Sequence, residues 1–354
     1  MGVYLTYYVF LIVSLIFSLK NRILDSYFYF FVSCVSVFFI GARFEVGADY
    51  TEYSSLFYSS ATTRFEPFFN VTFELFRELG FTYNSLSLCY FLLTILLLTY
   101  AIKDFEYKTL FLVSFILFLF VPITSTIRQG LSLPFYILAI VNYNSFKKYS
   151  IFTILGAFFH ASILVLIPLY LLSKFKISKF KFILLVFISI LVGFLNPINI
   201  LISLMQMISS DFLIANKLLT YSTRYSDPMS LSAQLYRVGF VVVLLYIWDV
   251  IENDRVAAFS KNIYIFIFLL TFVFKDNGVL VNRLAFSTNI TILCILSRYL
   301  ILENMSLKKT FVSLFLIVYF SVNYYKFIYT DMRHSVEKAY LPYKNGLIIN
   351  EFKK

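Results

Sequence analysis

Charged residues are scarce in this sequence. Of its 354 residues, 14% are Asp, Glu, Lys or Arg, whereas 60% are hydrophobic and 21% are aromatic. A soluble domain carries about a quarter charged residues and far fewer aromatic ones. The composition therefore excludes an ordinary soluble domain and indicates an integral membrane protein.

Cysteines and the motifs of soluble enzymes are also few or absent. Cys34, Cys89 and Cys294 are odd in number and each lies in an apolar run, so we interpret them as core residues. The sequence has no phosphate loop, no dinucleotide-binding glycine pattern, no Gly-x-Ser-x-Gly elbow and no paired acidic metal motif. These absences argue against cytosolic-type kinases and sugar-nucleotide enzymes. They predict that any group transfer proceeds without a metal or another cofactor.

The charge that is present is mostly positive. Lys and Arg number 30 against 19 Asp and Glu, which gives a formal net charge of +11. The basic residues form no periodic stripe on a soluble domain, so we attribute them to the positive-inside rule and expect no nucleic-acid partner. By that rule Lys20–Arg22, Lys147–Lys148 and Lys308–Lys309 are cytoplasmic, which places residues 41–66 on the outer side.

Most of the chain consists of apolar runs that can cross a lipid bilayer, with allowance for tilt. They predict an all-α fold, a polytopic transmembrane bundle of about 10–12 membrane segments in a single integral membrane domain, residues 1–354. The first run lacks a basic leader and a cleavage site, so we interpret it as a spanning helix and not as a signal peptide. The runs are Val3–Leu19, Leu24–Ile40, Tyr83–Ile102, Thr109–Ile123, Thr126–Tyr143, Ile151–Leu172, Phe182–Leu201, Leu231–Val250, Ile263–Phe274, Val279–Leu302 and Thr310–Phe327.

Three polar regions separate or follow these runs. Residues 41–82 are predicted to form an extracytoplasmic loop that ends in an interfacial helix, because polar residues interrupt the apolar ones over Glu66–Leu79. Residues 203–230 are predicted to form a larger polar loop, and residues 328–354 a C-terminal tail.

The run Ile151–Leu172 has two interpretations. It is either a re-entrant hairpin, which returns the following lysines to the cytoplasmic side, or a single span that puts those lysines at an outer mouth. At an outer mouth they would attract an anionic substrate. The hairpin also places residues 203–230 and Arg283 on the outer side, beside residues 41–66, and is preferred for that reason.

Charged residues near apolar runs are candidates for function, because a charge at mid-bilayer costs about 2.5–3.5 kcal/mol unless it has a partner or a wet cavity. In the first group, Arg43 can pair with Glu45 or hold a phosphate, and Asp49 or Glu45 can act as a base. The alternative is that this segment is simply a solvated loop.

A second group surrounds the start of a predicted helix. Thr126 and Gln129 have the spacing of a capping box, which places Arg128 in the first turn. Backbone N–H groups at a helix N-terminus, together with a guanidinium, suit a phosphate. The alternative is that Gln129 is only a cap and that Arg128 extends to the membrane interface.

Two more groups are centred on single residues. His160 is one of two histidines and lies in an apolar run, where it is either a core residue or a base that takes up a proton near neutral pH. Arg283, preceded by Asn282, follows the turn Lys275–Gly278 and can supply a second positive charge for a diphosphate.

Several of these segments stand in the order and spacing of a known family. They are Arg43–Tyr53 (RFEVGADYTEY), Glu66–Phe68, Ser125–Gly130 (STIRQG), Phe159–Ser162 and Asn282–Arg283. In these segments the chain resembles the EpsG-like branch of the Wzy-type polysaccharide polymerases, over about residues 40–290. The ending Tyr340–Tyr343 is similar to that of the family as well.

The resemblance implies a multi-pass enzyme of the bacterial cell membrane that makes capsule, exopolysaccharide or O-antigen. Such enzymes polymerise oligosaccharide repeat units carried on undecaprenyl diphosphate, at the outer face of the membrane. The resemblance also implies a GT-C-like bundle. Besides the lipid-linked oligosaccharide and the bilayer, a flippase and a chain-length regulator are conceivable partners.

With that family in view, we assign roles as hypotheses. Arg128, Arg283 and Arg43 are predicted to bind the diphosphate, because fixed positive charge stabilises a leaving group that gains negative charge. His160 is the first candidate for the base that activates the acceptor hydroxyl, and Asp49 is the second. The predicted sugar-binding residues are Glu45, Tyr50, Glu66, Gln129 and Asn282.

Two other functions stay open on the sequence alone. A lipid-linked oligosaccharide flippase or transporter would also place charges in a polar cavity, although no pair of inverted repeats is visible. A membrane acyltransferase that modifies polysaccharide would also use a histidine and arginines.

Overall fold

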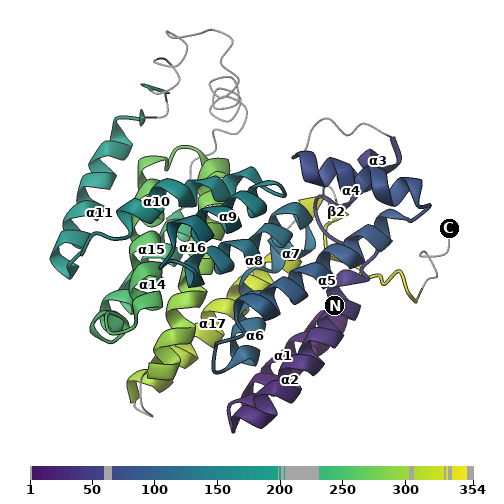
Figure 1. Cartoon of the computed structure of the whole chain (residues 1–354), viewed down its shortest axis with the longest axis horizontal. Helices are drawn as coiled ribbons and strands as arrows, with labels where there is room; N and C mark the ends of the chain where they lie inside the picture. The colour runs from purple at the N-terminus through teal and green to yellow at the C-terminus, as the bar shows by residue number, and fades with distance from the viewer. Residues whose placement is uncertain are drawn as a thin grey trace. The chain divides into compact units, whose positions relative to one another are not determined.

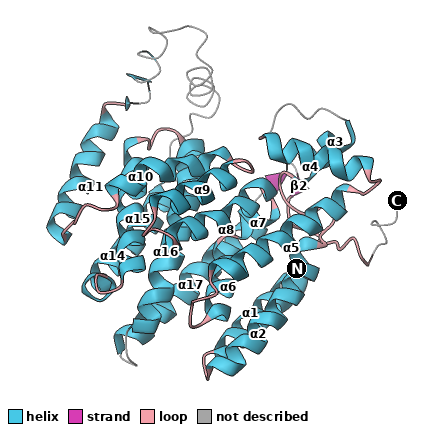
Figure 2. Ribbon diagram, viewed as in Figure 1, coloured by secondary structure: helices cyan, strands magenta, loops and turns pink. Residues whose placement is uncertain are grey.

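The protein is almost entirely helical (Figures 1 and 2). The structure is a computed structural model that describes residues 2–59, 66–197, 199–200, 203, 231–302, 307–330, 332–333 and 337–348. The only strands in this described part are β1 (Met332–Arg333) and β2 (Glu337–Lys338), which pair in antiparallel register. The expected all-α class is therefore confirmed, and the polar loop predicted at 203–230 lies almost wholly outside the described residues.

The chain divides into two compact units, one formed by Met1–Ile167 with Asn304–Lys354 and the other by Pro168–Glu303. The single integral domain expected from the sequence stays a prediction. The helices of the first unit are α1 (Gly2–Ser18), α2 (Arg22–Ser36), the π-helix η1 (Val37–Gly41), α3 (Tyr50–Ser59), α4 (Pro67–Glu78), α5 (Tyr83–Ala101), α6 (Lys108–Phe118), α7 (Phe120–Thr124), α8 (Ile127–Val141), α9 (Phe146–Ala157), the 3-10 helix η2 (Ala161–Val165) and α17 (Leu307–Thr330).

The second unit is built around α15 (Arg255–Val273), which packs against both α16 (Gly278–Leu302) and α11 (Lys179–Phe194). Helix α14 (Leu231–Ile251) also lies in this unit and contacts α15 and α16. The short helix α10 (Leu166–Leu172) begins at the boundary between the units.

Three helices in the described part are long and apolar enough to cross a membrane. They are Arg22–Gly41, in which α2 continues into η1, Tyr83–Ala101 and Arg255–Val273. Several shorter apolar helices accompany them: Gly2–Ser18, Lys108–Phe118, Ile127–Val141, Ala161–Leu172 and Phe286–Leu302. Length and composition therefore support a membrane protein, and the count of 10–12 segments stays a prediction.

One aromatic core cluster positions the polar residues of the first unit. It joins α3, α4, α5 and α8, and its members are all at most 5% exposed. Edge-on ring pairs within it, such as Tyr50–Tyr83 at 5.1 Å and Tyr53–Phe69 at 5.7 Å, hold the helices in a fixed relation. The members are Tyr50, Tyr53, Phe57, Phe69, Phe73, Tyr83, Leu86, Tyr90, Ile127 and Leu131.

The apolar run Ile151–Leu172 is broken at His160. Helix α9 ends at Ala157, His160 has an extended backbone (φ −154°, ψ 110°), and η2 begins at the next residue. The Tyr149 hydroxyl donates a hydrogen bond to the carbonyl of Leu166 over 3.0 Å. In a straight helix these residues would be about 25 Å apart, so the chain folds back here. The side of the membrane on which the following lysines lie stays a prediction.

The C-terminal segment folds onto residues 42–47. The amide of Phe44 donates to Lys344 O at 3.0 Å, and Gly346 donates to Ala42 O at 2.7 Å. Arg43 and Asn345 form an antiparallel bridge between these contacts. The predicted tail, residues 328–354, thus begins as the end of α17. Farther along, residues 339–346 pack against residues 42–47 and hold them in place, and we call residues 339–346 the C-terminal strap.

Gly47 lies between this strap and residues Thr124 and Ser125 at the end of α7. Its φ is +112°, its amide donates to Ala339 O at 2.7 Å, and a Cβ there would lie 2.7 Å from the Thr124 carbonyl oxygen. We expect Gly47→Ala to lower the free energy of unfolding by roughly 2 kcal/mol or more, because backbone strain and a backbone clash combine. Thermal unfolding in detergent measures the effect.

Gly80→Ala is the matched control for this prediction. Gly80 also has a positive φ (+73°), but a Cβ there would meet nothing within 4 Å. Its replacement carries the backbone strain alone, about 1–2 kcal/mol. Equal losses for the two variants would mean that the close approach to Thr124 is unimportant.

Candidate functional site

Four polar side chains from four different segments meet beside the aromatic core cluster. Glu66 occupies the N-cap position of α4 with an extended backbone (φ −61°, ψ 146°), and Pro67 follows at the first helical position, where its fixed φ suits a helix start. Arg128 lies in the first turn of α8, Tyr53 lies in α3, and His160 occupies the break after α9. We call Tyr53, Glu66, Arg128 and His160 the polar cluster.

The Glu66 carboxylate joins the other members of the polar cluster. Its Oε2 accepts a charged hydrogen bond from Arg128, and its Oε1 lies 3.4 Å from His160 Nδ1. The backbone N–H of Ala161 also donates to Oε1, at 3.2 Å. Arg128 Nε donates to the Tyr53 hydroxyl at 3.2 Å, and its guanidinium lies 5.6 Å from the Tyr53 and Phe69 ring centres.

The members of the polar cluster are only slightly exposed. Exposed fractions are 18% for the Arg128 side chain, 15% for Glu66 and 12% for His160. Neither ring nitrogen of His160 has a well-aligned hydrogen-bond partner among the described residues, and both nitrogens are buried. A buried polar atom without a hydrogen-bond partner costs free energy. A hydroxyl group of a bound molecule could supply the missing hydrogen bond to His160.

The electrostatics of the polar cluster keep Glu66 ionised. Burial alone would raise the pKa of its carboxyl group, but the proximity of His160 and the charge of Arg128 outweigh burial and lower that pKa to about 2. Burial raises the pKa of the Tyr53 phenol to about 12, so Tyr53 stays neutral and serves as a hydrogen-bond partner. An ionised Glu66 can only accept hydrogen bonds. In a neutral His160 it therefore favours the tautomer whose proton is on Nδ1, the nitrogen beside Glu66.

The helix start predicted at Thr126 is confirmed, but the capping box is wrong. Helix α8 begins at Ile127, and the Thr126 side chain caps no backbone N–H group. The Thr126 hydroxyl instead donates to the Gln129 side-chain oxygen at 3.4 Å. The reason is the backbone of Thr126 (φ −90°, ψ 64°), which is not the extended form of an N-cap. Gln129 is 5% exposed, inside the protein.

Arg43 is not a member of the polar cluster. It is 2% exposed, and its guanidinium donates to Ile40 O at 2.7 Å, while its Nε has no hydrogen-bond partner among the described residues. Its backbone bridges to Asn345 in the C-terminal strap. These contacts give Arg43 a place in the packing of residues 38–47 against the strap.

Glu45, Asp49 and Tyr50 have separate surroundings. Glu45 forms an exposed ion pair with Lys344, both side chains being 43% exposed. Asp49 directly precedes α3, and its carbonyl accepts from the Tyr53 amide at 3.0 Å. Tyr50 is 5% exposed and donates to Asn84, so its ring belongs to the aromatic core cluster. Asn282 and Arg283 lie in α16 of the second unit, and their side chains lie outside the described part of the structure.

In the part of the chain that the structure describes, no three His, Cys, Asp or Glu side chains gather as a metal site would require. The arrangement that is present combines a carboxylate, a guanidinium and an imidazole. It can hold an imidazole in one orientation and can present positive charge to an anion.

Comparison with known proteins bears on these residues. The profile of the EpsG family matches residues 26–345, nearly the whole chain. The chain belongs to the EpsG family. No curated protein and no solved structure is significantly similar to it.

The match confirms the family predicted from the sequence. The EpsG family is associated with polymerases of polysaccharide biosynthesis. Family membership and the three apolar helices together make this chain a membrane protein. The match includes all four members of the polar cluster, which lie between residues 53 and 160.

The sequence did not predict the contacts of two of the cluster residues, Glu66 and Tyr53. That Glu66 binds sugar stays a prediction, and in the structure its carboxylate lies between Arg128 and His160. Tyr53 carried no signal in a chain with 28 tyrosines. The Glu66–Pro67 pair was an available signal for a helix start, because Pro is favoured at the first helical position and restricts the preceding residue to an extended backbone.

Proposed function

We propose that this EpsG protein polymerises oligosaccharide repeat units linked to undecaprenyl diphosphate. The product would be a capsular, exo- or O-antigen polysaccharide, made at the outer face of the bacterial cell membrane. One observation carries the proposal: the Glu66 carboxylate joins an imidazole to a guanidinium in a nearly buried site. Glycosyl transfer from a lipid diphosphate needs both a base and positive charge.

His160 supplies the base in this proposal. Glu66 Oε1 lies 3.4 Å from Nδ1, so its negative charge favours the proton on Nδ1 and leaves Nε2 to take the proton of the acceptor hydroxyl. The hydroxyl oxygen forms a bond to the anomeric carbon of the donor as the bond from that carbon to the diphosphate oxygen breaks. The bonding electrons leave with the diphosphate, and the ionised Glu66 stabilises the imidazolium that has formed.

Arg128 supplies positive charge near the leaving group. Its guanidinium is fixed by Glu66 and by the Tyr53 hydroxyl, so little reorganisation is needed when charge develops. Gln129, next to Arg128, and Asp49, which precedes α3, remain proposed contacts to sugar or alternatives for the base. Arg283 remains a proposed second charge, in α16.

The fold offered with this function is a GT-C-like bundle of about 10–12 membrane segments. It would act with the lipid bilayer, a flippase and a chain-length regulator. The three helices that are long and apolar enough to cross a membrane, and the shorter apolar helices beside them in the sequence, support this proposal.

A deletion strain tests the proposed function. Loss of a polymerase is expected to abolish long polysaccharide and to leave single lipid-linked repeat units on the outer face of the membrane. Mass analysis of lipid-linked intermediates, with and without an outside-acting glycosidase, measures this. Single units trapped inside would indicate a flippase, and chains of normal length that lack acyl groups would indicate an acyltransferase.

A further inference from the structure

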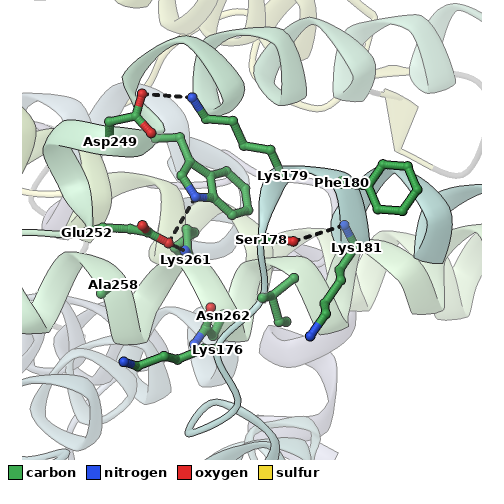
Figure 3. A pocket seen from close by; sticks show the side chains of 12 residues that line it. Lys176, Ser178, Lys179, Phe180, Lys181, Asp249, Glu252, Ala258, Lys261 and Asn262 are labelled. Atoms are coloured by element: carbon green, nitrogen blue, oxygen red, sulfur yellow. Dashed lines mark hydrogen bonds and ion pairs between the residues drawn. The ribbon is translucent and has the colours of Figure 1, made fainter.

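The second unit contains a pocket of about 770 Å³ (Figure 3). It lies between the segment that leads into α11, the C-terminal end of α14 and the N-terminal end of α15. Nothing in the polar cluster of the first unit takes part in it. The lining residues that carry the argument are Lys176, Lys181, Trp248, Glu252, Lys261 and Asn262.

The pocket has an excess of positive charge. Four lysines and two carboxylates line it. Lys179 pairs with Asp249 at 2.8 Å and Lys261 pairs with Glu252 at 2.7 Å, which accounts for both carboxylates. Lys176 and Lys181 make no ion pair among the described residues, and both are exposed.

The wall around Lys261 is rigid. The Lys261 side chain is 3% exposed, and its Nζ lies 3.9 Å from the centre of the Trp248 ring. Glu252 Oε1 accepts hydrogen bonds from both Lys261 and the Trp248 indole N–H, the latter at 2.9 Å. Figure 3 shows Glu252 and Lys261 side by side in the lining of the pocket. A wall fixed in this way is preorganised for a ligand.

The start of α11 adds to the positive potential. Ser178 caps this 16-residue helix, and its first turn contains Lys179 and Lys181 and no acidic residue. Acidic side chains are the ones that a helix N-terminus ordinarily stabilises. Together with the N-terminus of the helix, the exposed Lys181 makes this end of the pocket favourable for an anion.

Asn262 places an acceptor without a partner in the same pocket. Its side-chain NH₂ group donates to the carbonyls of Ser173 (2.6 Å) and Phe175 (3.0 Å), which fixes the orientation of the amide. Its Oδ1 accepts no hydrogen bond from the described residues, although Asn262 is only 8% exposed. A hydroxyl group on the ligand would satisfy this oxygen after a small side-chain adjustment.

Large apolar side chains surround the lysines. Phe175 is 63% exposed and Phe180 is 76% exposed. Farther along α11, Ile183 and Phe187 are also more than half exposed. Exposed aromatic residues beside lysines are typical of the membrane interface, where apolar chains cover the rings and charged headgroups meet the lysines.

We propose that this pocket binds the headgroup of an anionic phospholipid. The phosphate would lie between Lys176 and Lys181 at the start of α11, and a headgroup hydroxyl would face Asn262. The acyl chains would cover Phe180 and the exposed face of α11. This site is separate from the proposed polymerase reaction and does not depend on it.

The test is a lipid titration of the full-length protein in detergent, followed by thermal unfolding or native mass spectrometry. Phosphatidylglycerol is expected to bind at least about tenfold more tightly than phosphatidylcholine, because only the first carries net negative charge. The double variant Lys176→Gln/Lys181→Gln is expected to bind phosphatidylglycerol roughly 30-fold more weakly. The double variant Lys147→Gln/Lys148→Gln, which removes two exposed lysines from the first unit, is the matched control and should bind normally.

Three results would overturn the proposal. Equal binding of the neutral and anionic lipids would remove the role of the headgroup charge. Unchanged binding in Lys176→Gln/Lys181→Gln would show that the lipid lies elsewhere. Soluble glycerol phosphate or inorganic phosphate that binds as tightly as the lipid would assign the pocket to a free phosphate instead.

Discussion

Replacing His160 with alanine is expected to lower the turnover of lipid-linked repeat units by roughly 10²–10⁴-fold, the usual contribution of a general base. The affinity for the lipid-linked donor should change little, because His160 lies beside Glu66 and is not one of the residues proposed to bind the diphosphate. Purified protein with lipid-linked repeat units gives both quantities. A loss in kcat without a matching change in KM is the result that identifies a group acting in the transition state.

Two variants make this prediction decisive. Leu164→Ala changes an exposed residue of η2, the same short segment, and should retain normal turnover. Asp49→Asn removes the second candidate for the base. Full turnover in His160→Ala, combined with a large loss in Asp49→Asn, would transfer the role of base to the carboxylate.

Glu66→Gln and Arg128→Gln are each expected to lower turnover by about 10² or more, because each breaks the fixed arrangement of the polar cluster. The double variant Glu66→Gln/Arg128→Gln should be no worse than the poorer single variant. Residues that act as one unit are non-additive, and a double-mutant cycle measures that coupling. Simple addition of the two losses would contradict the joint role.

Stability provides a second measurement of the same pair. Removing one partner of a largely buried ion pair leaves the other charge uncompensated, so each single variant should lose about 2–4 kcal/mol of unfolding free energy. The control is Lys344→Gln, which breaks an ion pair whose side chains are both 43% exposed. Exposed pairs contribute about 0–1 kcal/mol, so this control should be nearly neutral.

The pH dependence of the Glu66→Gln loss follows from the lowered pKa of Glu66. A carboxyl group with a pKa of about 2 in the folded protein and an ordinary value near 4.5 stabilises the folded state fully above pH 4.5 or so. That stabilisation decreases as the pH falls from there towards about 2. The difference between wild type and Glu66→Gln should therefore be constant above about pH 5 and shrink in acid.

A helix could be predicted accurately where the apolar run and a capping residue indicate the same start. The run expected at Tyr83–Ile102 is α5, Tyr83–Ala101, and Thr82 caps it by accepting from Ser85 N. Run length alone failed at Thr109–Ile123, which the structure divides into α6 and α7 at Leu119. Apolar residues continue through that division, so hydropathy contains no sign of it.

The break at His160 has a similar cause. Its neighbours are apolar on both sides, but Gly156 allows the returning segment to approach closely, since a Cβ there would lie 2.6 Å from Ile163 Cδ1. The sequence showed Gly156 and His160 without showing which residues they would meet. Only the folded-back chain brings the two halves together.

The sequence predicted which residues belong to the candidate site but not which of them contact one another. Arg128, His160 and Glu66 were each selected from local motifs, and the structure brings these three together. Two hydrogen bonds to the Glu66 carboxylate come from Arg128 and from the backbone of Ala161, the neighbour of His160, which are 62 and 95 positions away in the chain. Patterns with periods of two or four residues contain no information at such separations, so the joining role of Glu66 had to come from the fold.

The strap across residues 42–47 makes the order of synthesis matter. Glu45 and Lys344, which pair across it, are 299 positions apart in the chain. At about 5–20 residues per second, ribosomes take roughly 15–60 s to add that many residues. Throughout that time the polar segment ahead of α3 lacks its partner strand. A chain that stops before residue 339 lacks the strap and never forms its contacts with residues 42–47. Arg43 and Gly47 are therefore expected to be more accessible to proteases or labels in shortened products than in complete ones.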